Sequence, residues 1–260
     1  MTFDESNVKR ISRGTDYVFL LRFAVFRFSV CNMPRRSKII ASGVPLHIIQ
    51  RGNNRQSCFF ADEDYQFYIE WLKEYSQSAG CSIHAYVLMT NHVHLLLSPQ
   101  KIESVGQRYV QHINRTYKRS GTLWERRFRS SIIQQQDYLF VCQRYIEMNP
   151  VRAGIVDHPG EYRWSSYRIN GQGDKSDLIT HHVLYRNLGH DNEERQFACR
   201  GLFRHKLEPG EIDKIRKITN GNFALVSNRF TEEISEMLGR RVTPGKAGRP
   251  RKKPVAGKQK

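Results

Sequence analysis

The chain has 260 residues, and its 42 Lys and Arg against 25 Asp and Glu give a formal net charge of +17. A charge of this size favours a polyanionic partner, either nucleic acid or an anionic membrane surface. The five cysteines are odd in number and contain no C-x-x-C pair, which argues against a disulfide framework and a zinc ribbon and indicates a reducing cytoplasm.

The first 32 residues differ from the rest of the chain. The apolar run Tyr17–Cys31 contains Arg22 and Arg27 and is followed by no small-x-small cleavage site. It is also shorter than the about 20 residues that a bilayer span requires, so neither secretion nor membrane anchoring is expected. Because the sequence reads like a fresh start at Met33, we interpret 1–32 as an N-terminal extension. Whether Met1 or Met33 is the native start stays open.

Residues 33–170 alternate strand and helix patterns, which is typical of a small α+β domain. The Gly-Asn-Asn turn signal at 52–54 closes the first strand, and we expect Asp62 to cap the first helix and Gly80 to end it. Only Thr90-Asn91 separates the next two strands, which predicts a hairpin. The expected elements are strands at 45–52, 81–89, 92–98 and 128–134 and helices at 62–80, 102–118 and 137–148. This order predicts a ferredoxin-like antiparallel sheet with helices on one face.

Two histidines lie one residue apart at the head of the strand at 92–98. Because side chains alternate between the faces of a strand, His92 and His94 point to the same side and can reach one ion. The alternative is a chance pair among the ten histidines of the chain, since motif matches of this kind have many false positives.

The helix expected at 137–148 offers oxygen donors that fit such an ion. Tyr145 and Asn149 are four residues apart, so a phenol and a carboxamide project from one helical face. Pro150 disfavours helical geometry at Asn149, which places that residue at the end of the helix. Hard divalent ions prefer oxygen, tolerate imidazole and keep positions open for substrate phosphate. His92, His94 and Asn149 are therefore the candidate metal ligands.

Several motifs together resemble one family. H-V-H within M-T-N-H-V-H-L-L-L-S-P, the tract I-N-R-T-Y-K-R-S-G-T-L-W-E-R-R-F-R-S and Y-I-E-M-N-P-V-R-A-G look like the single-tyrosine HUH transposases, in particular the REP-associated tyrosine transposase group. The resemblance covers about 33–167. It implies a ferredoxin-like HUH nuclease domain that cuts single-stranded DNA at or near hairpins, with His92 and His94 as metal ligands, Tyr145 as the nucleophile and Asn149 as the third ligand.

The function expected from this resemblance is that of a transposase acting in DNA transposition and recombination. It would cleave and rejoin single-stranded DNA at hairpin-forming repeats through a 5′-phosphotyrosine, with Mg²⁺ or Mn²⁺ as cofactor. A phenol with its ordinary pKa of about 10 is a poor nucleophile, but a nearby cation favours the phenolate. A covalent intermediate keeps the phosphodiester energy, so a different 3′-hydroxyl can rejoin the strand. The alternative is a non-catalytic DNA-binding regulator on the same fold.

The partners expected with this function are single-stranded or hairpin DNA, no membrane, and a second copy of the chain in a homodimer. The expected location is the cytoplasm, in association with the nucleoid. Tyr109, Tyr117 and Tyr138 compete with Tyr145 for the nucleophile's role, although packing or base stacking explains each of them equally well.

Basic and aromatic side chains alternate along 115–129, a pattern that suits a groove for single-stranded DNA. The polar and basic side chains at 51–55 could serve the same purpose or form only a polar turn. A solvated charged loop, with Trp124 in the core, is the alternative. The candidate DNA-binding residues are Arg51, Asn53, Arg55, Arg115, Lys118, Arg119, Trp124, Arg126, Arg127 and Arg129.

The composition changes after the predicted nuclease domain. We interpret 171–180 as a linker, 181–242 as a small helical module and 243–260 as a disordered basic tail. The string G-R-P-R-K-K in the tail resembles an AT-hook, but we favour a tail that raises non-specific affinity for DNA.

Overall fold

The computed structural model describes residues 43–99, 106–125, 128–225, 235 and 242–243. The expectations for the extension at 1–32, for the tail beyond Thr243 and for Arg126 and Arg127 concern residues outside these ranges.

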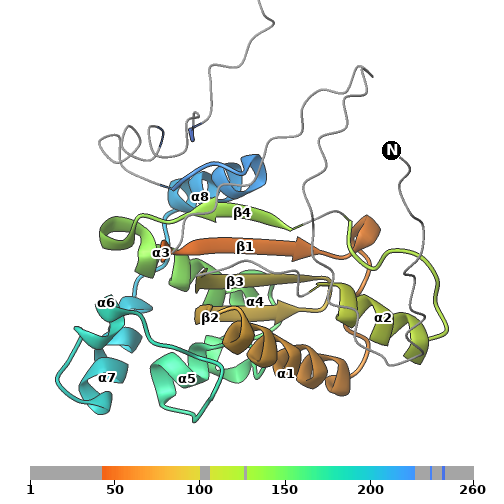
Figure 1. The fold of residues 1–260 in the computed structure, drawn as a ribbon. Coiled ribbons are helices and arrows are strands. Elements are labelled where there is room, and N and C mark those ends of the chain that lie inside the picture. Colours follow the sequence, from red (N-terminus) through yellow and green to blue (C-terminus); the bar gives the residue numbers. More distant parts are fainter. Residues whose placement is uncertain (1–42, 100–105, 126–127, 226–234, 236–241, 244–260) are drawn as a thin grey trace, which may run out of the picture. The chain divides into compact units, whose positions relative to one another are not determined.

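Four strands form one sheet in the order β2-β3-β1-β4, and every neighbouring pair is antiparallel (Figure 1). The strands are β1 (Leu46–Arg51), β2 (Ser82–Met89), β3 (His92–Ser98) and β4 (Arg129–Ile132). Thr90 and Asn91 join β2 to β3, as the hairpin prediction requires. The first and third strands therefore lie in the middle, which confirms the α+β class with ferredoxin-like strand order.

The helices are α1 (Asp62–Ser78), α2 (Gly106–Thr116), α3 (Gln135–Glu147), α4 (Asn149–Arg152), α5 (Tyr167–Gln172), α6 (Val183–Arg186), α7 (Asn192–Leu202) and α8 (Pro209–Gly221), with 3-10 turns η1 (Asn53–Arg55) and η2 (Pro159–Glu161). The N-cap of α1 is Ala61, not Asp62 as expected. Asp64 takes the capping role, because its Oδ2 accepts from the backbone nitrogens of Phe60 and Ala61 at 2.8 and 3.0 Å.

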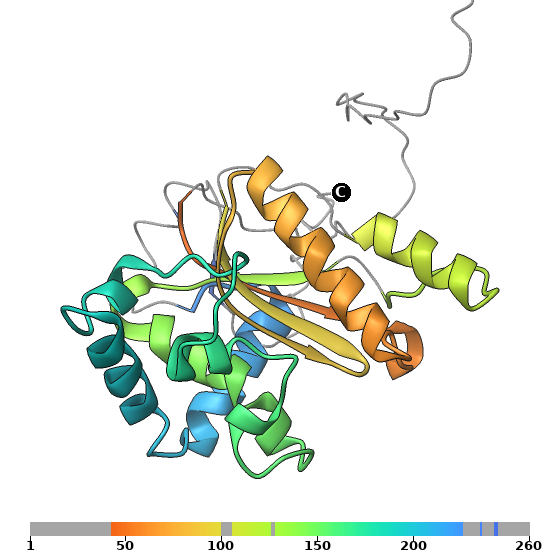
Figure 2. The same ribbon diagram turned by 90° about the horizontal axis from the view of Figure 1, so that it is seen from below.

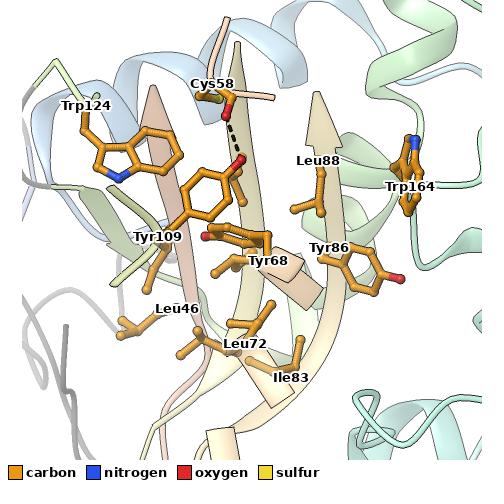
Figure 3. Packing of buried hydrophobic residues seen from close by; sticks show 14 of the residues in the cluster. Leu46, Cys58, Tyr68, Leu72, Ile83, Tyr86, Leu88, Tyr109, Trp124 and Trp164 are labelled. Carbon is orange, nitrogen blue, oxygen red and sulfur yellow. Dashed lines mark hydrogen bonds between the residues drawn. The ribbon is translucent and has the colours of Figure 1, made fainter. Parts of the chain in front are cut away.

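α1 and α2 cover one face of the sheet with the larger of two apolar clusters. Tyr68 and Leu72 of α1 and Tyr109 of α2 are at most 2% exposed and pack against apolar residues of β1, β2 and β3. Figure 3 shows Tyr109 next to Tyr68, with the Tyr109 hydroxyl donating to the backbone oxygen of Cys58 at 2.7 Å. Period-2 alternation on the strands thus buries the odd-numbered residues of β3, such as Val93, on this face.

α3 and α8 cover the opposite face, as Figure 2 shows with α3 in green and α8 in blue. Val87 of β2 and Leu96 of β3 join Ile146 of α3 and Ile215 of α8 in the second apolar cluster. The expectation that the helices lie on one face of the sheet is therefore wrong. α1 and α2 cover one face, and α3 and α8 cover the other. A sheet with apolar residues on both faces needs a cover on each side, and the helices that follow β4 supply the second.

The segment expected as a linker, 171–180, begins with the last two residues of α5 and reaches β2 at its end. Ile179 forms a parallel bridge with Ile83, and the backbone nitrogen of Thr180 donates to the Ile83 oxygen at 2.7 Å. α8 lies on β4, where the backbone nitrogen of Ser130 donates to Oδ1 of Asn222 at 3.0 Å. The described part of 181–242 is therefore not a separate module, because α8 belongs to the core of the sheet. Within the described ranges, no helix is both long and apolar enough to cross a membrane.

Candidate active site

The sheet register brings the histidine pair to the centre of one face. In the β1–β3 ladder, Ile49 lies opposite His94 and Arg51 lies opposite His92. The next residue on the same face of β3, Leu96, packs in the cluster that contains α3. Both imidazoles therefore face α3, as the alternation of the strand predicts.

α3 and α4 bring the phenol and the carboxamide to the same place. The ring centroid of Tyr145 lies 5.7 Å from that of His94, edge to face. Nδ2 of Asn149 lies 3.4 Å from Nε2 of His92. α3 ends at Glu147 and α4 begins at Asn149, so Pro150 occupies the first turn of a new short helix, where its missing N–H costs nothing. The four residues singled out by the sequence thus converge within one chain.

His92 is held by its neighbour in the hairpin. Its Nδ1 lies 2.6 Å from Oδ1 of Asn91, which can only accept, so Nδ1 carries the proton and Nε2 has the lone pair. Burial, and next the charge of Arg51, lowers the pKa of His92 to about 4. The ring is neutral at physiological pH, which is the form that binds a metal.

His94 is 3% exposed and is held by another histidine. Its Nδ1 lies 2.9 Å from Nε2 of His47 on β1, and Nδ1 of His47 lies 3.2 Å from the hydroxyl of Thr219 on α8. Burial lowers the pKa of His47 to about 3 and holds the pKa of His94 well below its usual value of 6.5. Both rings are therefore neutral at physiological pH.

A fixed positive charge lies against Tyr145. The guanidinium carbon of Arg152 is 4.4 Å from the centre of the Tyr145 ring, and Nη2 donates to the Tyr145 backbone oxygen at 2.6 Å. Burial lowers the pKa of Arg152 to about 10, so the group stays protonated near neutral pH. Nη1 of Arg152 is buried without a hydrogen-bond partner among the described residues, which leaves one strong donor beside the phenol.

A buried carboxyl anchors the end of α3 that carries Tyr145. Oε1 of Glu147 accepts from the hydroxyl of Ser166 at 2.6 Å and from Nδ2 of Asn170 at 2.7 Å, and Oε2 accepts from Nε2 of Gln143 at 3.3 Å. Burial raises the pKa of Glu147 to about 7 despite these bonds. The network ties α3 to α5 and thereby fixes the position of the phenol relative to the sheet.

The donor set fits a divalent ion. Within the described ranges, no three His, Cys, Asp or Glu side chains form a metal-binding group, so a site here depends on the carboxamide of Asn149. A 180° turn of that carboxamide would place Oδ1 toward His92, since the two ends of an amide exchange easily. Two neutral imidazoles and one amide oxygen suit Mg²⁺ or Mn²⁺ and leave positions for phosphate oxygens.

A polar cavity of about 540 Å³ lies next to this face of the sheet. Arg51 lies opposite His92, and Arg129 lies opposite Ile49 on the other side of β1. The cavity is lined by Arg51, Asn54, Arg55, Glu125, Arg129 and Asn220. Three guanidinium groups against one carboxylate make this cavity suitable for a phosphodiester.

The loop that contributes to this cavity has an unusual backbone. Asn54 and Arg55 both have positive φ, at 52° and 60°, a strained conformation for residues with a side chain. Gly52 before them cannot be replaced, because a Cβ there would lie 2.1 Å from the backbone oxygen of Gln56. The backbone of the loop is therefore constrained where it presents the Arg55 side chain to the cavity.

Of the other candidate DNA-binding residues, those that the structure describes do not line this cavity. Arg115 lies on α2, and Lys118 and Arg119 follow it, with the Arg119 guanidinium 5.3 Å from the centre of the Phe60 ring. Asn53 donates its backbone N–H to the Leu123 oxygen.

The prediction that Trp124 stacks on DNA bases is wrong. Its side chain is 5% exposed and packs in the core, 5.8 Å from the ring of Tyr109. Other side chains therefore cover the faces of its ring, and the alternative expectation, that Trp124 lies in the core, is confirmed.

The competing tyrosines lie away from the histidine pair and have other partners. Tyr109 is fully buried under α1, Tyr117 donates to Oδ2 of Asp64 at 2.9 Å, and the hydroxyl of Tyr138 accepts from Nζ of Lys214 at 2.7 Å. Tyr145 alone among these four contacts His94.

Sequence reasoning missed four residues that contact the site: Asn91, His47, Arg152 and Thr219. His47 is two positions from Ile49 on the same strand face as the histidine pair, a signal that alternation could have supplied. Arg152 is seven residues after Tyr145, which is two helical turns. No local pattern indicates Thr219.

Residues 41–149 match the family described as "Transposase IS200 like". This span contains His92, His94, Tyr145 and Asn149, and it confirms for this part of the chain the resemblance to transposases that the motifs indicate. Among the curated proteins, none matches the chain. A solved structure described as "Structure of the REP associates tyrosine transposase bound to a REP hairpin" is similar, with 17% identity, a TM-score of 0.47 and coverage of 58% of this chain and 93% of that chain.

Proposed function

Since residues 41–149 match the IS200-like transposases, we propose that the chain is a single-strand DNA endonuclease and strand transferase with Tyr145 as its nucleophile. The observation that carries the proposal is the convergence of His94, 5.7 Å from the Tyr145 ring, and His92, 3.4 Å from the Asn149 amide. A chance H-x-H pair would not meet a phenol and an amide from another element on a single face of the sheet.

A divalent cation held by His92, His94 and Asn149 would act as a Lewis acid on the scissile phosphate. The protein's own contribution is to hold both imidazoles neutral and oriented. Asn91 does this for His92 through Nδ1, and the buried contact with His47 does it for His94. Orientation by such partners is the usual way in which proteins fix histidine ligands.

The proposed reaction is an in-line displacement at phosphorus. A bond forms between Oη of Tyr145 and the phosphorus, and the bond between the phosphorus and the 3′-oxygen breaks. The phenolic proton leaves to solvent, and the departing 3′-oxygen takes up a proton. The products are a 5′-phosphotyrosine and a free 3′-hydroxyl, and attack by a different 3′-hydroxyl on the phosphotyrosine rejoins the strand.

Arg152 supports this step in two ways. Its positive charge lies 4.4 Å from the centre of the Tyr145 ring and can stabilise negative charge on the phosphate. Its Nη1, which has no hydrogen-bond partner among the described residues, can donate to a non-bridging oxygen of the phosphate. A donor that is fixed before the reaction stabilises the negative charge that develops in the transition state.

We propose single-stranded DNA, with hairpin-forming repeats as its source, as the substrate. The excess of positive charge and the arginine-lined cavity beside β1 support a DNA backbone. Because His92, His94, Tyr145 and Asn149 meet within one chain, the site needs no residue from a second copy. A homodimer and an association with the nucleoid remain predictions.

One observation favours the second candidate, a non-catalytic DNA-binding regulator. Tyr145 is only 5% exposed, whereas a nucleophile must reach the phosphorus. The enzyme reading therefore requires that substrate binding exposes the hydroxyl.

A denaturing gel separates the two candidates. A labelled single-stranded hairpin oligonucleotide is incubated with the full chain and Mn²⁺, and a covalent adduct is sought. The enzyme reading predicts an adduct with the native chain and with Tyr138→Phe, and none with Tyr145→Phe or after chelation of the metal, while all variants still bind the oligonucleotide. If the native chain binds the oligonucleotide but forms no adduct, the enzyme is excluded and the non-catalytic regulator is supported.

A further inference from the structure

A continuous series of buried hydrogen bonds links α8 to His94. The hydroxyl of Thr219 donates to the backbone oxygen of Ile215 at 2.9 Å, and the same oxygen lies 3.2 Å from Nδ1 of His47. Nε2 of His47 lies 2.9 Å from Nδ1 of His94. Thr219, His47 and His94 are 1%, 0% and 3% exposed. Bulk solvent therefore offers no alternative partner for these groups.

The direction of these bonds follows from counting protons. The Thr219 hydroxyl has one hydrogen, which goes to Ile215, so its oxygen must accept from Nδ1–H of His47. A neutral imidazole has one N–H, and Nε2 of His47 is therefore an acceptor. His94 must then donate from Nδ1, which leaves the lone pair of His94 on Nε2.

The opposite direction would disable the metal site. If Thr219 donated to His47, both rings would exchange tautomers and Nε2 of His94 would carry a proton. A protonated nitrogen has no lone pair for a cation. The hydroxyl of one threonine therefore selects between a metal-binding and a non-binding form of His94.

We propose that His47 and Thr219 are positioning residues that hold His94 as its Nδ1–H tautomer, with Nε2 available for the divalent cation. The inference rests on the metal site of the proposed function. It assigns a role in that site to α8, which lies beyond residues 41–149 matched by the transposase family.

α8 is fixed well enough to serve this role. Asn222, at its end, accepts from the backbone nitrogen of Ser130 at 3.0 Å, and the backbone nitrogen of Leu225 donates to the Ile132 oxygen at 2.7 Å. Both bonds go to β4, so the C-terminal end of α8, which carries Thr219, is tied to the sheet. Ser131 of β4 also contacts the Thr219 hydroxyl, at 3.2 Å, but lies outside the path to His94.

The test compares Thr219→Val, which removes the hydroxyl at nearly equal volume, with Thr219→Ser, which restores it. Ser131→Ala is the matched control, because it removes a neighbour of the same hydroxyl that does not lead to His94. The first readout is the tautomer of His47 and His94 in the metal-free full chain, from two-bond ¹⁵N–¹H NMR correlations. The second is the affinity for Mn²⁺ by calorimetry.

The inference predicts Nδ1–H for both rings in the native chain, in Thr219→Ser and in Ser131→Ala. It predicts loss of that tautomer in Thr219→Val, with Mn²⁺ affinity lowered by about 10- to 100-fold. Unchanged tautomers and affinity in Thr219→Val would overturn it while leaving the proposed function intact. A native chain that binds no Mn²⁺ would overturn both.

If Thr219→Val does not fold, His47→Phe tests the link from its other end. It removes the acceptor of the His94 Nδ1–H, so the same loss of tautomer and affinity is expected. An unchanged Nδ1–H tautomer of His94 in this variant would refute the role of the link.

Discussion

The carboxamide nitrogen of Asn149 lies 3.4 Å from Nε2 of His92. This contact joins the first residue of α4 to the first residue of β3, and both groups are candidate ligands of one cation. Each is oriented by its own segment: His92 by the side chain of Asn91 at 2.6 Å, and Asn149 by the start of a helix that contains Pro150. The contact suggests that the site is formed before the cation binds.

Replacement of Asn149 tests its role as a ligand. Asn149→Ala removes one of three donors, and we expect the affinity for Mn²⁺ to fall by at least about tenfold. Asn149→Asp keeps an oxygen donor and should bind at least as tightly as the native chain. Calorimetry with Asn187→Ala, a substitution at the C-cap of α6, gives the control. Equal affinities in Asn149→Ala and the control would remove Asn149 from the site.

Arg152 should matter for the rate of cleavage more than for DNA binding. Arg152→Ala removes the positive charge 4.4 Å from the Tyr145 ring and the unpartnered Nη1. We expect cleavage to slow by about 100- to 1000-fold, as for the loss of one fixed donor to a transition state. Arg152→Lys should recover part of the rate. Single-turnover cleavage at saturating oligonucleotide measures this, and a loss confined to affinity would contradict the proposed role.

The arginines of the cavity should contact phosphates. Arg55→Ala and Arg129→Ala should each lower the slope of log affinity against log salt concentration by about 0.7, the value for one phosphate contact on a single strand. Arg163→Ala is a suitable control, because that side chain pairs with Asp62 on the α1 side of the molecule at 2.8 Å. Equal slopes in all three variants would show that the cavity does not hold the DNA backbone.

The free energy of unfolding should fall as the pH falls from about 6.5 to about 4. Burial lowers the folded-state pKa of four histidines, to about 4 for His84 and His92, to about 3 for His47 and to a value well below 6.5 for His94. In this range the unfolded chain binds protons at these rings and the folded chain does not. Each histidine contributes a slope of at most about 1.4 kcal/mol per pH unit.

Glu147 acts in the opposite direction. Its folded-state pKa is raised to about 7, so between pH 4.5 and 7 the folded chain holds a proton that the unfolded chain releases. This group therefore favours the folded state as the pH falls, and one carboxyl offsets one histidine. Urea unfolding at pH 7 and pH 5 measures the net effect. A free energy of unfolding that is equal or higher at pH 5 would be inconsistent with four neutral histidines in the fold.

Much of the fold follows from short-range patterns. The two-residue turn between β2 and β3 and the alternation in β3 gave the hairpin and the common face of His92 and His94. The covering of both faces of the sheet could not be predicted in this way, because it depends on where α3 and α8 return after β4. For the same reason, the sequence of 171–180, which lacks apolar periodicity, does not show that Ile179 pairs with Ile83 of β2.

Of the candidate site, only the pairs of residues that lie close together in the sequence could be predicted. His92 with His94, and Tyr145 with Asn149, are local pairs whose spacing indicates a common face. The contact between His47 and His94 depends on the register of β1 against β3, and that of Thr219 depends on the packing of α8. The basic residues around Trp124 in the sequence favour a contact with DNA, whereas in the fold its ring packs against Tyr109.

The most direct test of the central claim is to locate the covalent attachment. The full chain is incubated with Mn²⁺ and a single-stranded hairpin oligonucleotide, the adduct is digested with protease and nuclease, and the modified peptide is identified by mass spectrometry. We expect a nucleotide joined through its 5′-phosphate to the peptide that contains Tyr145. A phosphonucleotide on any other residue, or none in a reaction that still cleaves the DNA, would contradict Tyr145 as the nucleophile.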